Sequence, residues 1–438
     1  MSQDDSSTST LRDAAIRARL RPDPEDVLRR AGRRIRRRRL RASLLGLSAG
    51  ALSVAVAASL FRSVGSHPNE RPTPSRIPTT TGAALPGTVT ATGDAVPEGR
   101  LVLQLNSGIE VLANGDRRSV ALGGGAIFAY DVSPDATNIL AAAYVTEPTH
   151  YTREDKLLTI DPSTGERTVL VHAGPKEDLG PAVWSPDGQR VAYRLTVLPV
   201  DPAKQRPQGT AEQTVCIVEV STLASRCFPD LGTVDSVAWS PDGHRIAVDG
   251  VGADLPLRLL DVETGGVSDF ASPLDPELVA SLGGDPPGSL VDVEWSPSGN
   301  YVATHADLIA ALFDSDGGFV TLGHETEEFS SVLAWSPTED LLAYAIGRPP
   351  YAITDLYVLD PATGEDRLLY STGGGGAAPI IDDVAWSPTG RWIALAITER
   401  TLHLEKSVRI IDLAGGHTRS IVRLRASDAA EVLAGWGP

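Results

Sequence analysis

The sequence predicts an all-β fold, a seven-bladed β-propeller preceded by one transmembrane helix, and three observations support this prediction. A Ser-Pro turn recurs six times, with 40 to 56 residues between successive copies. Each copy continues into a second β-rich unit with a turn of its own. Two incomplete units, one at each end of the repeat region, complete each other and provide the seventh blade.

The recurring turn reads Ser-Pro-Asp-Gly in its fullest form, and its prolines are Pro134, Pro186, Pro241, Pro297, Pro337 and Pro388. Proline presets φ, aspartate caps the backbone and glycine accepts a positive φ, so the motif predicts a tight turn between two strands. Four copies depart from the Asp-Gly pair, two of them with Asp135-Ala136 and Thr338-Glu339. Because a metal loop would need its ligands in every copy, we interpret the motif as structural. The tryptophan that precedes five of the six turns is predicted to pack between blades.

The second unit of each copy is a strand, a turn and a strand, as in Leu356 to Leu369 (LYVLDPATGEDRLL). One period is therefore four antiparallel strands, which we denote A to D. Such a sheet repeated about every fifty residues is typical of a β-propeller, whose radial repetition protects the sheet edges. Residues 100–122 match strands B, C and D, whereas Glu431 to Pro438 match strand A. Six whole blades and this composite give seven, with six or eight blades as alternatives.

The turn Trp-Ser-Pro-Asp-Gly followed by a hydrophobic strand, at 184–188 and 239–243, resembles that of the TolB-like propellers, exported relatives of WD-repeat proteins. The resemblance covers about residues 100–438 and implies the fold. It implies no single function, because propellers of this kind serve as binding scaffolds, as gates of enzymes and as catalysts.

The charge of the chain is divided unevenly between its two parts. The formal net charge is -17, and residues 1–42 contribute +7 from thirteen Arg and six acids, which leaves -24 for the remainder. So acidic a propeller disfavours binding to nucleic acid. The twenty uncharged residues 42–61 are long enough, at about 1.5 Å per residue, to cross a hydrocarbon core of roughly 30 Å. The arginines before this segment predict a cytoplasmic amino terminus and an extracytoplasmic propeller.

Two interpretations of residues 42–61 remain open, a retained anchor and a cleaved export signal. Ala55-Val56-Ala57 has the small residues of a cleavage site, and Arg38-Arg39-Leu40 is compatible with a twin-arginine signal. The predicted division is a basic cytoplasmic segment (1–41), a transmembrane helix (42–61), a disordered linker rich in Pro and Thr (62–98) and the propeller (99–438). The membrane is then one partner, and the basic segment is placed to meet a cytoplasmic protein.

All long insertions fall in loops from strand B to C or from D to A, which share one face of a propeller. They are Val145 to Lys156, Thr196 to Gln213, Gly347 to Thr354, Ala271 to Ser289 and Ser371 to Pro379. The inner strands enter from this face with Asp235, Asp292, Asp382 and Asp383, which we expect near the mouth of the channel. Converging carboxylates would attract a cation or a basic peptide; solvated strand-entry residues are the alternative. Further candidates in the loops are His150, Tyr151, Arg153, Arg206, Arg348 and Tyr351.

Cys216 and Cys227 flank a C-to-D hairpin and are placed to form a disulfide outside the membrane. No Gly-x-Ser-x-Gly elbow occurs and the eight histidines are scattered, so the sequence predicts no enzyme, cofactor or metal site. The expected function is a membrane-anchored extracytoplasmic binding or scaffold module for a protein, a peptide or an envelope component. A transmembrane sensor whose cytoplasmic segment binds a regulatory partner, and a propeller lyase or hydrolase, are the alternatives.

Overall fold

The structure is a computed structural model, and it divides the chain into two units, Met1–Arg71 and Pro72–Pro438. It describes residues 96–438 except 106–107, 122–125, 145–154, 175, 198–199, 202–205, 208–211, 230, 250–255, 283, 285–286, 288–289, 307–308, 324–328, 349–351, 374–377, 400–404 and 426–432. The predicted cytoplasmic segment, the transmembrane helix and nearly all of the linker lie outside these residues. Within the described part, no helix has the length and apolar character needed to span a bilayer.

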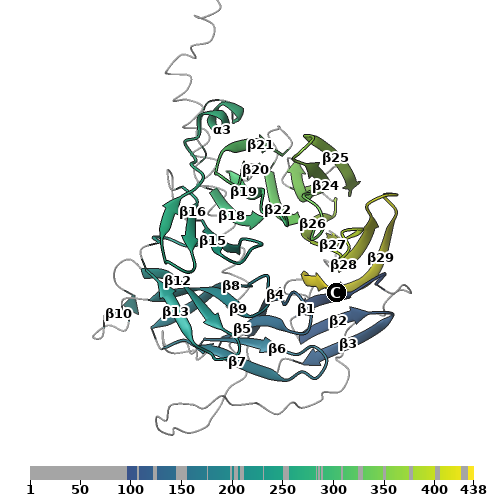
Figure 1. Cartoon of the computed structure of the whole chain (residues 1–438). Helices are drawn as coiled ribbons and strands as arrows, with labels where there is room; N and C mark the ends of the chain where they lie inside the picture. Colours follow the sequence, from purple (N-terminus) through teal and green to yellow (C-terminus); the bar gives the residue numbers. More distant parts are fainter. Residues whose placement is uncertain are drawn as a thin grey trace, which may run out of the picture. The chain divides into compact units, whose positions relative to one another are not determined.

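The described residues form seven four-stranded antiparallel sheets arranged around a centre (Figure 1). Blade 1 contains β30 (Leu433–Gly437), β1 (Arg100–Leu105), β2 (Gly108–Ala113) and β3 (Asp116–Ala121). Blade 2 contains β4 (Ala126–Val132), β5 (Ile139–Tyr144), β6 (Lys156–Ile160) and β7 (Arg167–His172). Blade 3 contains β8 (Glu177–Trp184), β9 (Arg190–Val197), β12 (Glu212–Glu219) and β13 (Ser225–Phe228). Blade 4 contains β14 (Val237–Trp239), β15 (Arg245–Val248), β16 (Arg258–Asp261) and β17 (Val267–Asp269).

Three further blades complete the ring. Blade 5 contains β18 (Leu290–Trp295), β19 (Tyr301–Ala306), β20 (Ile309–Asp314) and β21 (Phe319–Leu322). Blade 6 contains β22 (Phe329–Trp335), β23 (Leu342–Arg348), β24 (Ala352–Asp360) and β25 (Glu365–Ser371). Blade 7 contains β26 (Ile380–Trp386), β27 (Trp392–Glu399), β28 (Glu405–Asp412) and β29 (Thr418–Arg425). Two of the predicted long loops carry small elements, namely the hairpin of β10 (Val200–Asp201) and β11 (Arg206–Pro207), and the helix α3 (Pro276–Ser281).

The ring is closed by the composite blade that the terminal fragments predict. β30 pairs antiparallel with β1, so that Arg100 lies opposite Gly437 and Leu101 opposite Trp436. The indole Nε1 of Trp436 also donates a hydrogen bond to the carbonyl of Glu98 at 2.8 Å. The inner strands β4, β8, β14, β18, β22, β26 and β30 contact one another in this order, and β30 contacts β4. The prediction of seven blades is therefore confirmed.

The core of the ring lies between the blades. The buried apolar residues of the described chain fall into seven clusters, and each cluster joins two neighbouring blades. Strands in the middle of a blade are consequently covered on both faces, as β27 is, and read as continuous Ile, Leu and Ala. Outer strands such as β25 are largely exposed and carry charged residues. Each blade thus needs two neighbours to bury its apolar faces.

The Ser-Pro turns and the tryptophans take the roles predicted for them. Asp187 accepts hydrogen bonds from the Ser185 hydroxyl at 2.5 Å and from the Gln189 amide at 3.0 Å, while Gly188 has φ +67°. Trp386 is buried between blades 6 and 7, and its Nε1 donates to the carbonyl of Ala334 at 2.8 Å. The turns end the strands, and the tryptophans join the blades.

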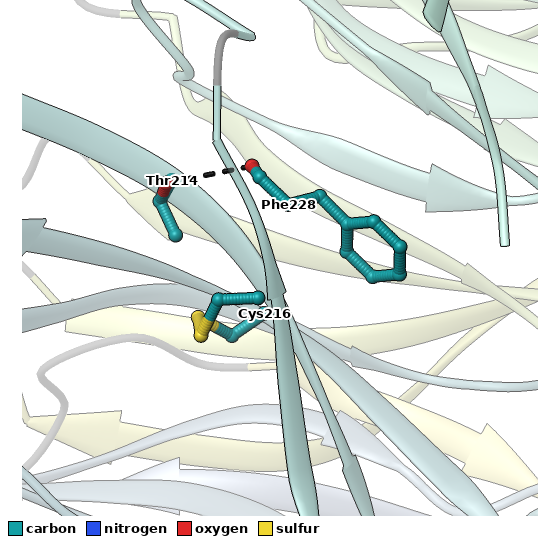
Figure 2. The surroundings of a disulfide bond; sticks show 4 residues. Thr214, Cys216 and Phe228 are labelled. Carbon is teal, nitrogen blue, oxygen red and sulfur yellow. Dashed lines mark hydrogen bonds between the residues drawn. A yellow bond between two sulfur atoms is a disulfide. The ribbon is translucent and has the colours of Figure 1, made fainter. Parts of the chain in front are cut away.

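A disulfide between Cys216 and Cys227 links β12 to β13 in blade 3 (Figure 2). The two cysteines are direct partners in the antiparallel register of this hairpin. Beside them, the Thr214 hydroxyl donates to the carbonyl of Phe228 at 3.4 Å. The disulfide therefore fastens the outer strand of blade 3 to its neighbour.

We expect the double variant Cys216→Ala/Cys227→Ala to be less stable than the wild type by about 2 to 3 kcal/mol, because the disulfide no longer restrains the unfolded hairpin. The free energy of unfolding from urea titrations, with the oxidised wild type as reference, measures this loss. Adding reductant should destabilise the wild type and leave the variant unchanged. Equal unfolding midpoints for the oxidised and reduced wild type would contradict the prediction.

Candidate functional site

The inner strands of blades 2 to 5 line a cavity of about 500 Å³ at the centre of the ring. Its lining residues include the acids Asp131, Asp292 and Glu294, which come from β4 and β18. Apolar side chains such as Val183 and Trp184 complete the wall. We call the channel lining around these three carboxyl groups and Asp383 the acidic mouth.

Glu294 is the most strongly perturbed group of the acidic mouth. It stands directly before Trp295 on β18 and is partly buried. Burial raises the pKa of its carboxyl to about 8, with further contributions from the charges of Asp292, Asp383 and Asp131. These neighbours belong to the inner strands of blades 5, 7 and 2, so negative charge converges on Glu294 from different sides of the channel. At neutral pH Glu294 consequently keeps its proton.

Asp131 lies at the end of β4 and links blades 2 and 3. Its Oδ2 accepts a hydrogen bond from the Trp184 amide at 2.9 Å, and its Oδ1 accepts one from the Val132 amide at 2.7 Å. Burial nevertheless raises the pKa of Asp131 to about 6, because two amide donors offset only part of the cost of removing the charge from water.

Asp292 presents its carboxylate toward solvent from an unusual backbone conformation. Its φ is +60°, in the left-handed region, where the pairing of β18 with β19 is irregular between Val291 and Glu294. The side chain is 63% exposed, and its Oδ2 lies 3.2 Å from Nδ1 of His305. Because non-glycine residues adopt positive φ at a cost, such a conformation marks a place where the surrounding structure dictates the backbone.

The four aspartates expected at the mouth divide into two pairs. Asp292 and Asp383 contribute to the field at Glu294, whereas Asp235 and Asp382 lie beside an Arg and a Lys, which are charged at neutral pH. Asp235 lies 3.6 Å from the Arg194 guanidinium. Asp382 accepts a hydrogen bond from the Thr398 hydroxyl and lies 3.9 Å from the ammonium of Lys406, although burial still raises its pKa. The second pair is thus engaged within the scaffold.

The six remaining candidates are the loop residues named from the sequence. His150, Tyr151, Arg153 and Tyr351 lie outside the described residues. The backbone of Arg206 belongs to β11, and that of Arg348 ends β23.

Sequence reasoning missed Asp131, Glu294 and the buried Asp249. A repeat alignment contains a signal for the first two, since the position before the tryptophan is apolar in other copies: Val183, Ala238, Ala334 and Ala385. An acid at an otherwise apolar position of an inner strand points to the channel. Asp249 follows a B strand and has no such signal.

No protein-family model matches the chain, and no curated protein matches it in sequence. Among solved structures, an oligogalacturonate lyase in complex with manganese is 14% identical with a TM-score of 0.51, and the match covers 76% of this chain and 86% of that one. An oligogalacturonate lyase from Vibrio parahaemolyticus is 12% identical with a TM-score of 0.50, covering 74% and 86%. These likenesses show the fold. It is the propeller fold that the TolB-like repeats imply.

The fold does not transfer the chemistry of these lyases. In the part of the chain that the structure describes, no three His, Cys, Asp or Glu side chains are grouped so as to hold a metal ion. We derive no step through a metal in this chain.

Proposed function

We propose that this protein is a membrane-anchored extracytoplasmic propeller that binds a positively charged peptide or protein segment at its acidic mouth. The observation that supports this most is the convergence of Asp131, Asp292 and Asp383 on the buried Glu294, whose pKa is raised to about 8 by burial first and by these charges second. The arginines before residues 42–61 support the position beyond the membrane. The proposal assigns binding and no catalytic step.

A cationic side chain would be attracted to the carboxyl groups of the acidic mouth. Carboxylates that share a site raise one another's pKa, and a neighbouring cation favours their ionised forms. An ammonium or guanidinium group entering the cavity would relieve the repulsion at Glu294. Asp235 and Asp382 attract a cationic ligand less strongly, because their carboxylates already lie beside Arg194 and Lys406. Beyond these contacts, the net charge of the propeller steers cations toward it from a distance.

The dimensions of the mouth suit part of a ligand. Binding pockets for small ligands measure roughly 300 to 1,000 Å³, and the cavity of about 500 Å³ lies within that range. A polypeptide would insert one or two basic side chains and lie across the surrounding loops. Tryptophans such as Trp184 give the cavity an apolar wall for the aliphatic stems of Lys or Arg.

The test is the affinity of the full-length protein in lipid nanodiscs for fluorescein-labelled hexalysine, measured by anisotropy at pH 8.5 and low salt. We expect Asp292→Asn/Glu294→Gln to weaken binding at least tenfold, because the ligand loses two carboxylates at the mouth. The matched control is Asp235→Asn/Asp382→Asn, which removes the same charge from paired positions and should change the affinity less than threefold.

Equal losses in the two double variants would reduce the effect to general surface charge and contradict the proposal. No measurable binding of hexalysine by the wild type at low salt would also contradict it.

A further inference from the structure

Asp249 is a buried carboxylate that joins blades 4 and 5. It follows β15, and the residue is only 1% exposed. Its Oδ1 accepts hydrogen bonds from the amides of Asp235 at 3.1 Å and Ser236 at 2.5 Å. Its Oδ2 accepts one from the Ser236 hydroxyl at 2.7 Å and one from the amide of Asp292, in the next blade, at 2.7 Å. Four donors from two inner-strand entries thus meet on a single side chain.

The Ser236 hydroxyl extends this junction by one residue. It donates to Asp249 and accepts a hydrogen bond from the Val293 amide at 3.0 Å. Two successive amides of β18, those of Asp292 and Val293, are therefore held by blade 4. The left-handed φ of Asp292 lies at this place, so the junction holds the backbone in a conformation that a non-glycine residue does not adopt by preference.

We propose that Asp249 is a positioning residue that presents the Asp292 carboxylate to the ligand only while Asp249 is ionised, so that acidification loosens the mouth through a blade junction that the ligand does not touch. This inference rests on the proposed function of the acidic mouth. It adds regulation by pH to binding, and it assigns that regulation to a residue behind the mouth.

The hydrogen bonds explain why ionisation matters. An ionised carboxylate accepts from all four donors, whereas a protonated one has an O–H that must itself donate. Protonation of Oδ2 conflicts with the donors Ser236 and Asp292, and protonation of Oδ1 conflicts with those of Asp235 and Ser236. In either case the four bonds no longer coexist, and the junction loses at least one of them.

The charges around Asp249 place this change at mild acidity. The net pKa of Asp249 is raised to about 6. Burial is the largest cause, the bonds from Ser236 and Asp292 oppose it, and the charge of Asp235 adds to it. Of the charged groups on the elements packed here, Asp235 is paired with Arg194 of blade 3, and Asp292 with His305 of β19. Arg245 of β15, Arg258 of β16 and Glu294 of β18 also lie on these elements. The junction should therefore loosen as the pH falls through about 6.

The first readout is hydrogen exchange of residues 290–296 in the full-length protein in nanodiscs, corrected for intrinsic exchange rates. In the wild type we expect exchange to become at least tenfold faster between pH 7.5 and pH 5. In Asp249→Asn it should be fast at both pH values, because the amide group cannot accept from four donors. Ser236→Ala, which changes no charge, should also speed exchange at pH 7.5.

The second readout is the affinity for labelled hexalysine at pH 7.5 and pH 5. Glu294 and Asp131 titrate in every variant, so the quantity to compare is the ratio of the affinities at pH 7.5 and pH 5. We expect this ratio to be at least threefold larger in the wild type than in Asp249→Asn. Glu110→Gln is the control, since Glu110 is 1% exposed, is paired with Arg117 at 2.6 Å and lies in blade 1. It should leave both readouts unchanged.

If residues 290–296 of Asp249→Asn exchange as slowly as those of the wild type, the positioning role is overturned, even if hexalysine binds. The absence of hexalysine binding at every pH would instead overturn the proposed function and the regulatory role with it, while the exchange data still decide whether Asp249 holds Asp292. The two failures are thus distinguishable.

Discussion

A variant that lacks Leu433–Pro438 is expected not to fold into a stable ring. The deletion removes β30, the inner strand of blade 1, and with it the contacts to the inner strands of blades 7 and 2. Leu433 and Trp436 belong to the apolar cluster that contains Leu101 and Leu103, both fully buried in the intact ring. Removing a buried Trp alone costs about 3 to 5 kcal/mol, a large share of the roughly 5 to 15 kcal/mol that stabilises a domain.

Circular dichroism and limited proteolysis of the truncated protein measure this effect. Deletion of Pro438 alone is the matched control, because this exposed residue follows β30 and should be dispensable. Trp436→Ala should lie between the two, destabilised by about 3 to 5 kcal/mol through loss of packing and of the hydrogen bond to Glu98. A protease-resistant truncated protein with a wild-type unfolding midpoint would show that the ring does not depend on β30.

The second large effect is an increase in stability as the pH falls from about 9 to about 5. The pKa of Glu294 is raised to about 8, and those of Asp131 and Asp249 to about 6. A raised pKa means that the folded protein binds protons that the unfolded chain releases in this range. The stabilisation is therefore complete below the unfolded pKa values, near 4, and is lost as the pH rises through 6 and then 8. Over its whole range, down to about pH 4, the shift of Asp249 corresponds to about 3 kcal/mol of stability against global unfolding, although its protonation costs the local blade junction a hydrogen bond.

The opposite behaviour begins at lower pH. Asp187 and Asp242, in the Ser-Pro turns, have a pKa below the usual range because of hydrogen bonds from the preceding serines and following amides. Both are largely solvated, so their contribution is small, and it is lost only when the pH falls below about 4. Maximal stability is consequently expected between about pH 4 and pH 5.

Thermal midpoints between pH 4 and pH 9 measure this profile. Glu294→Gln should be more stable than the wild type by roughly 1 to 3 kcal/mol at pH 9, since it removes a carboxylate that is costly to ionise, and the two should converge below pH 6. Glu110→Gln should instead be destabilising at every pH, because it breaks the pair with Arg117. A wild-type thermal midpoint that rises steadily from pH 5 to pH 9 would contradict the raised pKa values of Glu294, Asp131 and Asp249.

Much of the fold could be predicted because its signals are local. The Ser-Pro turn encodes its own geometry within four residues, and the alternation of turns and apolar runs gives the strand order. The helix α3 also has a local signal that the loop assignment overlooked, namely Asp275 as N-cap, accepting from the amides of Glu277 and Leu278, followed by Pro276 in the first turn.

The acidic mouth could be predicted only in part, because its chemistry depends on partners from other blades. Asp235 and Asp292 occupy similar places before their tryptophans, yet Arg194 of the preceding blade pairs with the first. Nothing near Asp249 in the sequence reveals that amides of two blades will point at it. Whether a carboxylate is free or engaged is decided by contacts between strands that are far apart in the chain.

The bond from Trp436 to Glu98 joins residues 338 positions apart. Contacts of such long range form slowly, since the entropy of the intervening chain opposes them until most of the molecule is in place. The flanks of blades 7 and 2 that face blade 1 must therefore wait, with apolar residues uncovered, until the final strand arrives. The interval between synthesis and closure is the period in which chaperones and proteases would meet this protein, and it ends only when the last six residues of the sequence pair with β1.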